Sequence, residues 1–418
     1  MGFWDTVKGW FGGAPDEPAP EIDPHDVFRD EVRAVALAMD AFDTVTPHPR
    51  EFALDVVPRG GPAMACYLSN LYLETRALSP DDRTDRIAFF LATMTERPEL
   101  PTDWATAMEM VLPVLRPAAF FLAANTNGRR PPMAMRPFLP LLNEVLAIDL
   151  PNSLSYARLD QLEEWGVTLE QAFDAARANL AAFADEGLER YDPTANIWHL
   201  AGGDDYESSR LLLPGWLAGF ADRVDGVPIA AIPHRSACLI GGDGDDAMVA
   251  RLLQSVRAEY ENSPRPISPA LYAVREGEVV PFLPSDSPHA ASADEGHLVL
   301  ASIEYGEQKE VLDAWHEAND VDLFVASYSV YRSPSGLFSV AVWGEDVDSL
   351  LPKARRIAVV GGDMDSGDTW TIQVSWGDLV ELVGGALELD PELDPPRWRT
   401  TRWLADSELD ALRERSID

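Results

Sequence analysis

The sequence predicts an α+β protein with a mixed helix and sheet N-terminal domain and a smaller, strand-rich α/β C-terminal domain. Three observations lead to this prediction. The 418 residues exceed the usual size of one hydrophobic core. Apolar residues at helical spacing alternate with short apolar runs typical of strands, and the proline-marked polar stretch 284–296 separates two such regions. We therefore expect a helix at 1–13, a linker at 14–25, domains at 26–283 and 297–418, and a second linker at 284–296.

Residues 1–13 place apolar side chains on one face of an expected helix. These side chains are Phe3, Trp4, Val7, Trp10 and Phe11. A helix this short is not stable alone in water, so residues 2–11 need a bilayer interface or a protein groove unless they stay disordered. The single lysine and the acidic residues that follow disfavour an anionic membrane. The sequence leaves a membrane surface and a protein partner as open alternatives.

The first domain is expected to begin at about residue 26, after an acidic linker. Residues 14–25 contain four prolines and four acidic residues, a composition that cannot bury enough surface to fold. Apolar spacing then predicts helices at 27–39, 64–78 and 83–95, and strands at 52–57 and 141–150. Thr168 begins the best-defined helix, because Gln171 three residues later completes a capping box.

The stretch 202–235 carries the densest pattern in the chain. Gly202 and Gly203 indicate a turn, and Asp204 or Asp205 can cap a helix whose apolar side is Leu211, Leu212, Trp216, Leu217 and Phe220. Two uncharged runs, 227–232 and 237–240, predict buried antiparallel strands. A helix at 247–261 and a hairpin of 271–274 with 279–283 complete the domain.

The second domain is expected to be rich in strands. The pattern predicts a strand at 298–305, a helix at 307–319 and a short helix at 378–383. It also predicts two hairpins. One joins 321–331 to 336–343, and the other joins 356–360 to 370–376.

Charge and cysteine content narrow the class of protein. The formal net charge is -37, and this excess of acid disfavours nucleic-acid binding, which depends on lysine and arginine. Cys66 and Cys238 each lie in an apolar run, so we expect buried free thiols in a reducing compartment. The sequence has no secretory signal and no transmembrane stretch, which predicts a cytoplasmic protein, with a peripheral position at the inner face of the membrane as an option.

The motifs for metals and cofactors are missing or incomplete. The acidic turns at 241–246 and 361–368 do not keep the ligand spacing of a calcium loop, so we interpret them as hairpin turns. His199, between Trp198 and Leu200, is interpreted as a half-buried structural histidine. The sequence contains no phosphate-binding loop, no dinucleotide fingerprint and no zinc spacing, so we expect no cofactor and no metal.

A small set of polar residues in the stretch 202–235 is the candidate site. Asp205, Ser208 and His234 have the residue types of a nucleophilic serine site, although the chain lacks the usual glycine-flanked serine elbow. Arg210 and Arg235 have the chemistry to hold an anion. A purely structural role, in which these side chains satisfy the start of a helix and pair with neighbours, stays beside both alternatives.

Several short motifs occur in the order seen in one bacterial family. They are 109–116, the stretch from Leu146 to Leu180, 205–212, 229–235 and 267–282. Through them the chain resembles the YtpQ-like family, a domain of unknown function, over residues 28–283. The resemblance implies a cytoplasmic bacterial α/β domain with no assigned activity or cofactor. The family usually has an aspartate where this chain has Ser236, which puts any chemistry of that carboxylate in doubt.

These observations favour a cytoplasmic binding or scaffolding protein. It would be attached to a protein partner or a membrane surface through residues 2–11. Two alternatives remain, a hydrolase that uses Ser208 and His234 and a small-anion sensor that uses Arg210 and Arg235.

Overall fold

The computed structural model describes the chain from Asp23 to Ile417 with short gaps. The residues outside the description are 1–22, 50–51, 96–98, 125–126, 152, 183–186, 193–195, 201–202, 204, 334–335, 364–367 and 418. The expected N-terminal helix and most of the acidic linker fall outside the described residues. The α+β class is confirmed, because helices accompany several antiparallel and mixed sheets.

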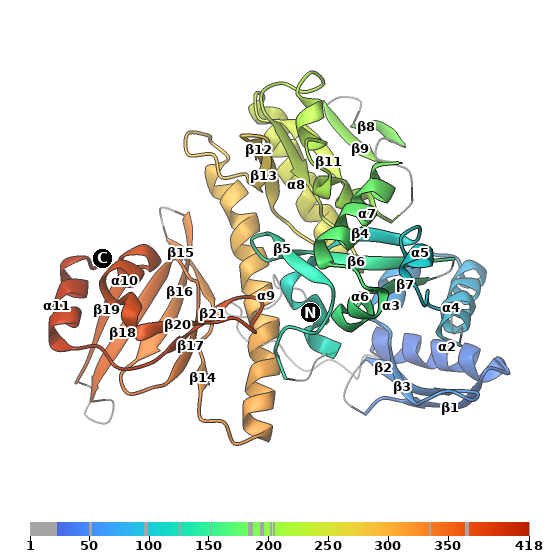
Figure 1. The fold of residues 1–418 in the computed structure, drawn as a ribbon, viewed down its shortest axis with the longest axis horizontal. Coiled ribbons are helices and arrows are strands. Elements are labelled where there is room, and N and C mark those ends of the chain that lie inside the picture. The colour runs from blue at the N-terminus through green and yellow to red at the C-terminus, as the bar shows by residue number, and fades with distance from the viewer. Residues whose placement is uncertain are drawn as a thin grey trace, which may run out of the picture. The chain divides into compact units, whose positions relative to one another are not determined.

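The described residues form two compact units, shown along the chain in Figure 1. Unit 1 comprises the segment that ends at Thr102 together with Asp149–Ser155 and Ala258–Pro266. Unit 2 comprises Asp103–Ile148, Tyr156–Arg257 and Ile267–Asp418. The residues on both sides of the expected linker at 284–296 therefore lie in unit 2.

Unit 1 combines helices with a small antiparallel sheet, and α2 packs on β1 and β2 of that sheet. The sheet has the order β1-β2-β3, with β1 at Phe42–Pro47, β2 at Ala53–Pro58 and β3 at Met64–Tyr67. The helices are α2 (Pro24–Ala38), α3 (Ser69–Thr75) and α4 (Pro80–Thr95). Helix α2 begins at Pro24, inside the expected linker, because the carboxylate of Asp23 accepts a hydrogen bond from His25 N at 2.8 Å and caps the helix.

The next sheet along the chain has the order β4-β6-β5, with β7 paired to β6. It belongs to unit 2 apart from Asp149–Ser155, which unit 1 includes. These strands span β4 (Val111–Pro117), β5 (Met135–Leu139), β6 (Leu142–Leu150) and β7 (Ser153–Tyr156). Its helical elements are α5 (Trp104–Ala107), the 3-10 helix η1 (Ala118–Ala124), α6 (Leu159–Trp165) and α7 (Leu169–Ala181). The predicted capping box at the start of α7 is confirmed, since Thr168 Oγ1 accepts from Gln171 N and Gln171 Oε1 accepts from Thr168 N.

A six-stranded sheet follows in the order β13-β12-β10-β11-β9-β8. Its strands are β8 (Leu188–Asp192), β9 (Ile197–Leu200), β10 (Pro228–Ala231), β11 (Leu239–Gly242), β12 (Leu271–Arg275) and β13 (Glu278–Pro281). The expected antiparallel pair is confirmed, because Ile229 pairs with Gly241 and Ala231 with Leu239. Helix α8 (Asp246–Asn262) contributes Met248 and Leu252 to one core of this sheet.

The long helix α9 (Ala290–Ala318) corrects two expectations from the sequence. It begins inside the expected linker at 284–296 and includes the stretch 298–305 that was expected to be a strand. Leu298, Ala301, Tyr305 and Leu312 are buried along it at helical spacing. A short apolar run cannot be assigned to a strand or a helix by its periodicity alone, which explains the error.

Two further four-stranded sheets complete unit 2. One has the order β14-β17-β21-β20, with β14 (Phe324–Val325), β17 (Ser349–Pro352), β20 (Leu387–Asp390) and β21 (Arg397–Thr400). The other has the order β15-β16-β18-β19, with β15 (Ser329–Ser333), β16 (Gly336–Gly344), β18 (Arg356–Asp363) and β19 (Asp368–Ser375). The helices here are α10 (Trp376–Val383), the 3-10 helix η4 (Gly384–Ala386) and α11 (Asp406–Glu414). The predicted hairpin of 356–360 with 370–376 occurs as β18 with β19, while β16 and β18 pair in parallel. The hairpin predicted for 321–331 with 336–343 occurs only in part, because β15 pairs with β16 but Phe324–Val325 belongs to the other sheet as β14.

Candidate functional site

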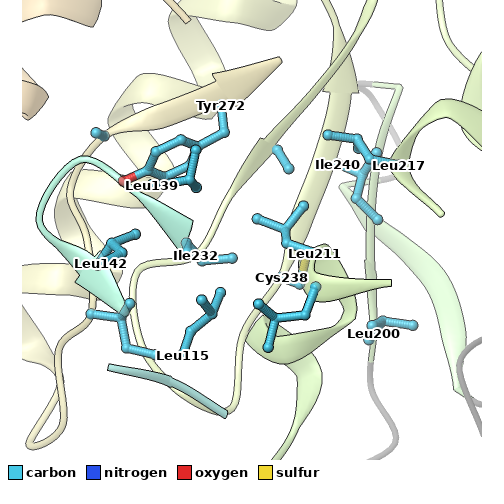
Figure 2. Close-up of a cluster of buried hydrophobic side chains, with 14 of the residues drawn as sticks. Leu115, Leu139, Leu142, Leu200, Leu211, Leu217, Ile232, Cys238, Ile240 and Tyr272 are labelled. Carbon is cyan, nitrogen blue, oxygen red and sulfur yellow. The ribbon is translucent and has the colours of Figure 1, made fainter. Parts of the chain in front are cut away.

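The segment that carries Ser208 and Arg210 is part of the hydrophobic core. It forms the 3-10 helix η2 (Glu207–Leu212), and a second 3-10 helix η3 (Leu217–Phe220) follows. The expected single α-helix is therefore wrong, because Pro214 lacks an N–H and Gly215 has a φ of 72°, which interrupt helical hydrogen bonding. Figure 2 shows Leu211 from η2 in the same cluster as Cys238 and Ile232.

Asp205 joins the start of this segment to the loop after β10. It has a left-handed backbone, with a φ of 65°, and its carboxylate accepts a hydrogen bond from Arg235 Nη2 at 2.6 Å. The hydroxyl of Ser236 also donates to this carboxylate. An aspartate in place of Ser236 would bring a second negative charge to Asp205, so the serine suits the ion pair found here. The corner made of Asp205, Arg235 and Ser236 is thus an internally paired surface feature.

Ser208 lies three residues after Asp205 in the chain and is only 1% exposed. Its backbone N donates to Arg235 O at 3.2 Å, but its Oγ is enclosed and has no hydrogen-bond partner among the described residues. A nucleophilic serine needs a hydrogen bond to its general base and access to the substrate. The hydrogen bond from Ser208 to His234 that the hydrolase hypothesis requires is therefore not formed, and the enclosed Oγ of Ser208 is not open to a substrate.

The two candidate arginines differ in their exposure to solvent. Arg210 has no exposed surface, and its Nη1 donates to Tyr206 O at 3.0 Å. Arg235 is partly exposed and is paired with Asp205. An anion from solvent cannot reach Arg210 without unpacking the core, so the structure does not bring these two guanidinium groups together at an open site.

Cys238, which lies next to this segment, is a buried free thiol, and so is Cys66. Burial raises the pKa of Cys238 to about 12, although the nearby charge of Arg210 opposes the shift. A thiol with such a pKa is protonated at neutral pH and is a poor nucleophile. The expectation of two buried free cysteines is confirmed.

Replacing Ser208 with alanine is expected to leave the free energy of unfolding unchanged or to raise it by about 1 kcal/mol, because the change removes an enclosed hydroxyl that has no partner. The matched control is Ser209→Ala, since Ser209 Oγ accepts from Leu115 N at 3.4 Å and its loss should be destabilising. Denaturant unfolding measures both variants. Labelling of Ser208 by a serine-directed fluorophosphonate would contradict the buried, unreactive state.

Arg116 is a polar residue of unit 2 that the sequence patterns did not single out. It is 7% exposed near the end of β4, and its Nε donates to the hydroxyl of Tyr156 at 2.9 Å. Its Nη1 donates to Leu115 O at 2.7 Å, and its Cζ lies 5.2 Å from the ring centroid of Phe120. The signal in the sequence was one charged residue at the end of the uncharged run 110–115.

Helix α9 holds a second set of buried polar groups. The carboxylate of Glu304 accepts from Ala119 N, at the start of η1, at 2.6 Å, and burial raises the pKa of Glu304 to about 8. Asp394 accepts a hydrogen bond from Asn143 Nδ2 at 2.6 Å. Within the described ranges no group of three or more histidine, cysteine or acidic side chains is arranged to hold a metal ion. These carboxylates therefore act as acceptors that join chain segments inside unit 2.

Among the helices that the structure describes, none is long and apolar enough to cross a membrane.

Comparison with known proteins finds one weak likeness. The chain is similar to a UPF0354 protein from Listeria welshimeri, with 21% identity over 203 residues. The matched region is 48% of this chain and 75% of the Listeria protein. No family model matches the chain, and no solved structure matches it. The likeness to a bacterial protein family thus covers about half of the chain, and the YtpQ-like assignment stays a prediction.

Proposed function

We propose that this chain is a binding or scaffolding protein rather than an enzyme. The observation that carries the proposal is the state of Ser208, whose Oγ is enclosed and makes no hydrogen bond among the described residues. The carboxylate of Asp205 is taken by Arg235 and Ser236, so it does not serve as the third member of a catalytic set. The hydrolase alternative would require the core around η2 to open before any chemistry.

We further propose that residues 2–11 attach the protein to its binding surface, at the inner face of the membrane or on a protein partner. Support comes from the sequence, which places Phe3, Trp4, Val7, Trp10 and Phe11 on one face of a helix. Such a face gains free energy by leaving water, and it has no stable fold of its own. The acidic stretch that follows would let the folded units stand away from that surface.

Flotation with vesicles tests the attachment. We expect the intact chain to float with phosphatidylcholine vesicles, because its aromatic face partitions into the interface, and the chain lacking residues 1–13 to stay behind. A variant with Trp4→Ser and Trp10→Ser should behave like the truncated chain. The matched control, Thr6→Ser with Lys8→Gln, changes the opposite face and should float like the intact chain. Equal flotation of intact and truncated chains would remove the membrane attachment and leave only the protein partner.

A further inference from the structure

Among the residues that the structure describes, Arg116 is a buried cation with no acidic partner. Among the described residues no carboxylate forms an ion pair with it, and all of its polar contacts are to neutral groups. Removing a charge from water is costly, so buried charged side chains are normally paired with an opposite charge.

Two other arginines, Arg397 and Arg86, show how an arginine with a purely structural role is held in this protein. Arg397 is fully buried and uses all three of its nitrogens as hydrogen-bond donors. Arg86, which also lies beside a phenylalanine, is neutralised by Glu74 at 2.6 Å. Arg116 differs from both, because its Nη2 donates no hydrogen bond to any described residue. Nη2 is not among the fully enclosed polar atoms that lack a partner, so this nitrogen keeps some solvent-accessible surface.

Two aromatic rings lie close to the Arg116 guanidinium. Its Cζ lies 5.2 Å from the ring centroid of Phe120 and 5.5 Å from that of Tyr156. These two rings meet edge to face with centroids 5.7 Å apart, and Phe121 packs against Tyr156 at 4.9 Å. The Tyr156 hydroxyl accepts from Nε, so the plane and direction of the guanidinium are set. Phe120 is 45% exposed, which leaves an apolar surface open beside the free nitrogen.

We propose that Arg116 and Phe120 form a binding site for a small organic anion. A carboxylate or phosphate oxygen of the ligand accepts a hydrogen bond from Nη2 of Arg116, and a flat apolar part of the ligand lies against the exposed ring of Phe120. The preformed orientation of the guanidinium lowers the entropy lost on binding. This inference rests on the proposed binding function and names its ligand class. It also moves the expected anion site from Arg210 and Arg235 to the end of β4.

Titration calorimetry on the full chain tests the site with phenyl phosphate, benzoate, inorganic phosphate and neutral benzamide. The buffer should contain physiological salt, which screens the overall negative charge. We expect phenyl phosphate and benzoate to bind about tenfold or more tightly than benzamide, because charge-assisted hydrogen bonds to arginine are strong. Inorganic phosphate should bind more weakly than phenyl phosphate, since it cannot use the ring of Phe120.

Two substitutions and two matched controls locate the binding. Arg116→Gln should weaken both aromatic anions about tenfold or more. Phe120→Ala, at an exposed ring, should reduce the affinity for phenyl phosphate to that for inorganic phosphate and leave the fold unchanged by circular dichroism. Arg86→Gln and Phe89→Ala alter another arginine–phenylalanine contact, of 5.6 Å, and should bind like the wild type. Unchanged affinity in both Arg116→Gln and Phe120→Ala would overturn the site.

The results of these experiments distinguish a failure of the Arg116 site from a failure of the proposed binding function. If none of the anions binds at millimolar concentration, the site is rejected, while vesicle flotation still reports on the attachment. If phenyl phosphate binds at Arg116 and phosphorus NMR shows its hydrolysis, the site stands and the non-catalytic function is rejected. A lipid phosphate is a second source of the same chemistry. Vesicles with phosphatidylglycerol, tested on the chain lacking residues 1–13 with and without Arg116→Gln, distinguish it from a soluble anion.

Discussion

Replacing Arg397 with methionine is expected to lower the free energy of unfolding of unit 2 by about 3 to 5 kcal/mol. The fully buried guanidinium donates to Gln308 Oε1 at 2.6 Å, Ala326 O at 2.7 Å, Tyr305 O at 3.0 Å and Leu350 O at 3.1 Å. Methionine fills much of the volume but donates no hydrogen bond. Four buried acceptors would then lose a donor.

Arg397 therefore joins α9 to β21 and to the segments around β14 and β17. Burial lowers its pKa to about 10, so it stays charged at neutral pH. Chemical denaturation followed by tryptophan fluorescence measures the change. The matched control is Arg399→Met on the same strand, where the side chain is exposed and the effect should stay within about 0.5 kcal/mol. Equal losses of stability in the two variants would show that the buried network contributes nothing specific.

The contribution of Glu304 to the free energy of unfolding is expected to be large and to depend on pH. Burial raises the pKa of Glu304 from 4.5 to about 8, and the hydrogen bond from Ala119 N opposes this shift. A raised pKa means that the folded state holds the proton more tightly than the unfolded state does. The stability that this proton contributes is present below pH 4.5 and is lost as the pH rises through about 8.

Glu304→Gln should therefore be more stable than the wild type at high pH and similar to it at low pH. The difference should grow by about 3 to 5 kcal/mol between pH 4.5 and pH 8, because glutamine stays neutral and can still accept from Ala119 N. His297 acts in the opposite direction, since burial lowers its pKa to about 4. Both proteins retain His297, so its contribution cancels in the difference.

Unfolding curves at several pH values measure this effect. Glu310→Gln, at an exposed position of the same helix, serves as the control and should follow the wild type throughout. A difference between Glu304→Gln and the wild type that does not change with pH would mean that Glu304 is ionised in the folded protein.

The sequence predicted those parts of the fold whose cause is local. The capping box at Thr168 and Gln171 is complete within four residues, and the structure contains it. The hairpin of β12 with β13 turns at Glu276 and Gly277, both with positive φ, as a tight turn requires. Helix α8 was predicted to within one residue at each end, because its apolar spacing extends over several turns.

Predictions failed for two short apolar runs. The run 298–305 is helical because α9 buries it against strands and 3-10 turns from other parts of unit 2. The apolar residues 211–220 suggested one helix, but Pro214 and Gly215 divide it into two 3-10 helices. The first run was compatible with more than one structure and packing selected the helix, whereas the second run is divided by two residues of its own.

The candidate site also has one part that the sequence predicted and another that it did not. Asp205 and Arg235 belong to one stretch in the sequence, and the structure pairs them. The chemistry of the candidate residues depends on how far each one is buried, which the sequence does not reveal. The structure shows that Ser208 and Arg210 are enclosed in the core. The surroundings of Arg116 are set by the tertiary structure, which brings Tyr156 and Phe120 to its guanidinium.

The sequence by itself determined the α+β class, the net charge, the free cysteines and the locally capped helices and turns. Each of these depends on composition or on residues close together in the chain. Only the tertiary structure decided which polar side chains are paired, enclosed or open to solvent. The reason is that exposure and hydrogen bonding are set by neighbours from distant segments, as Tyr156 is for Arg116 and Gln308 is for Arg397.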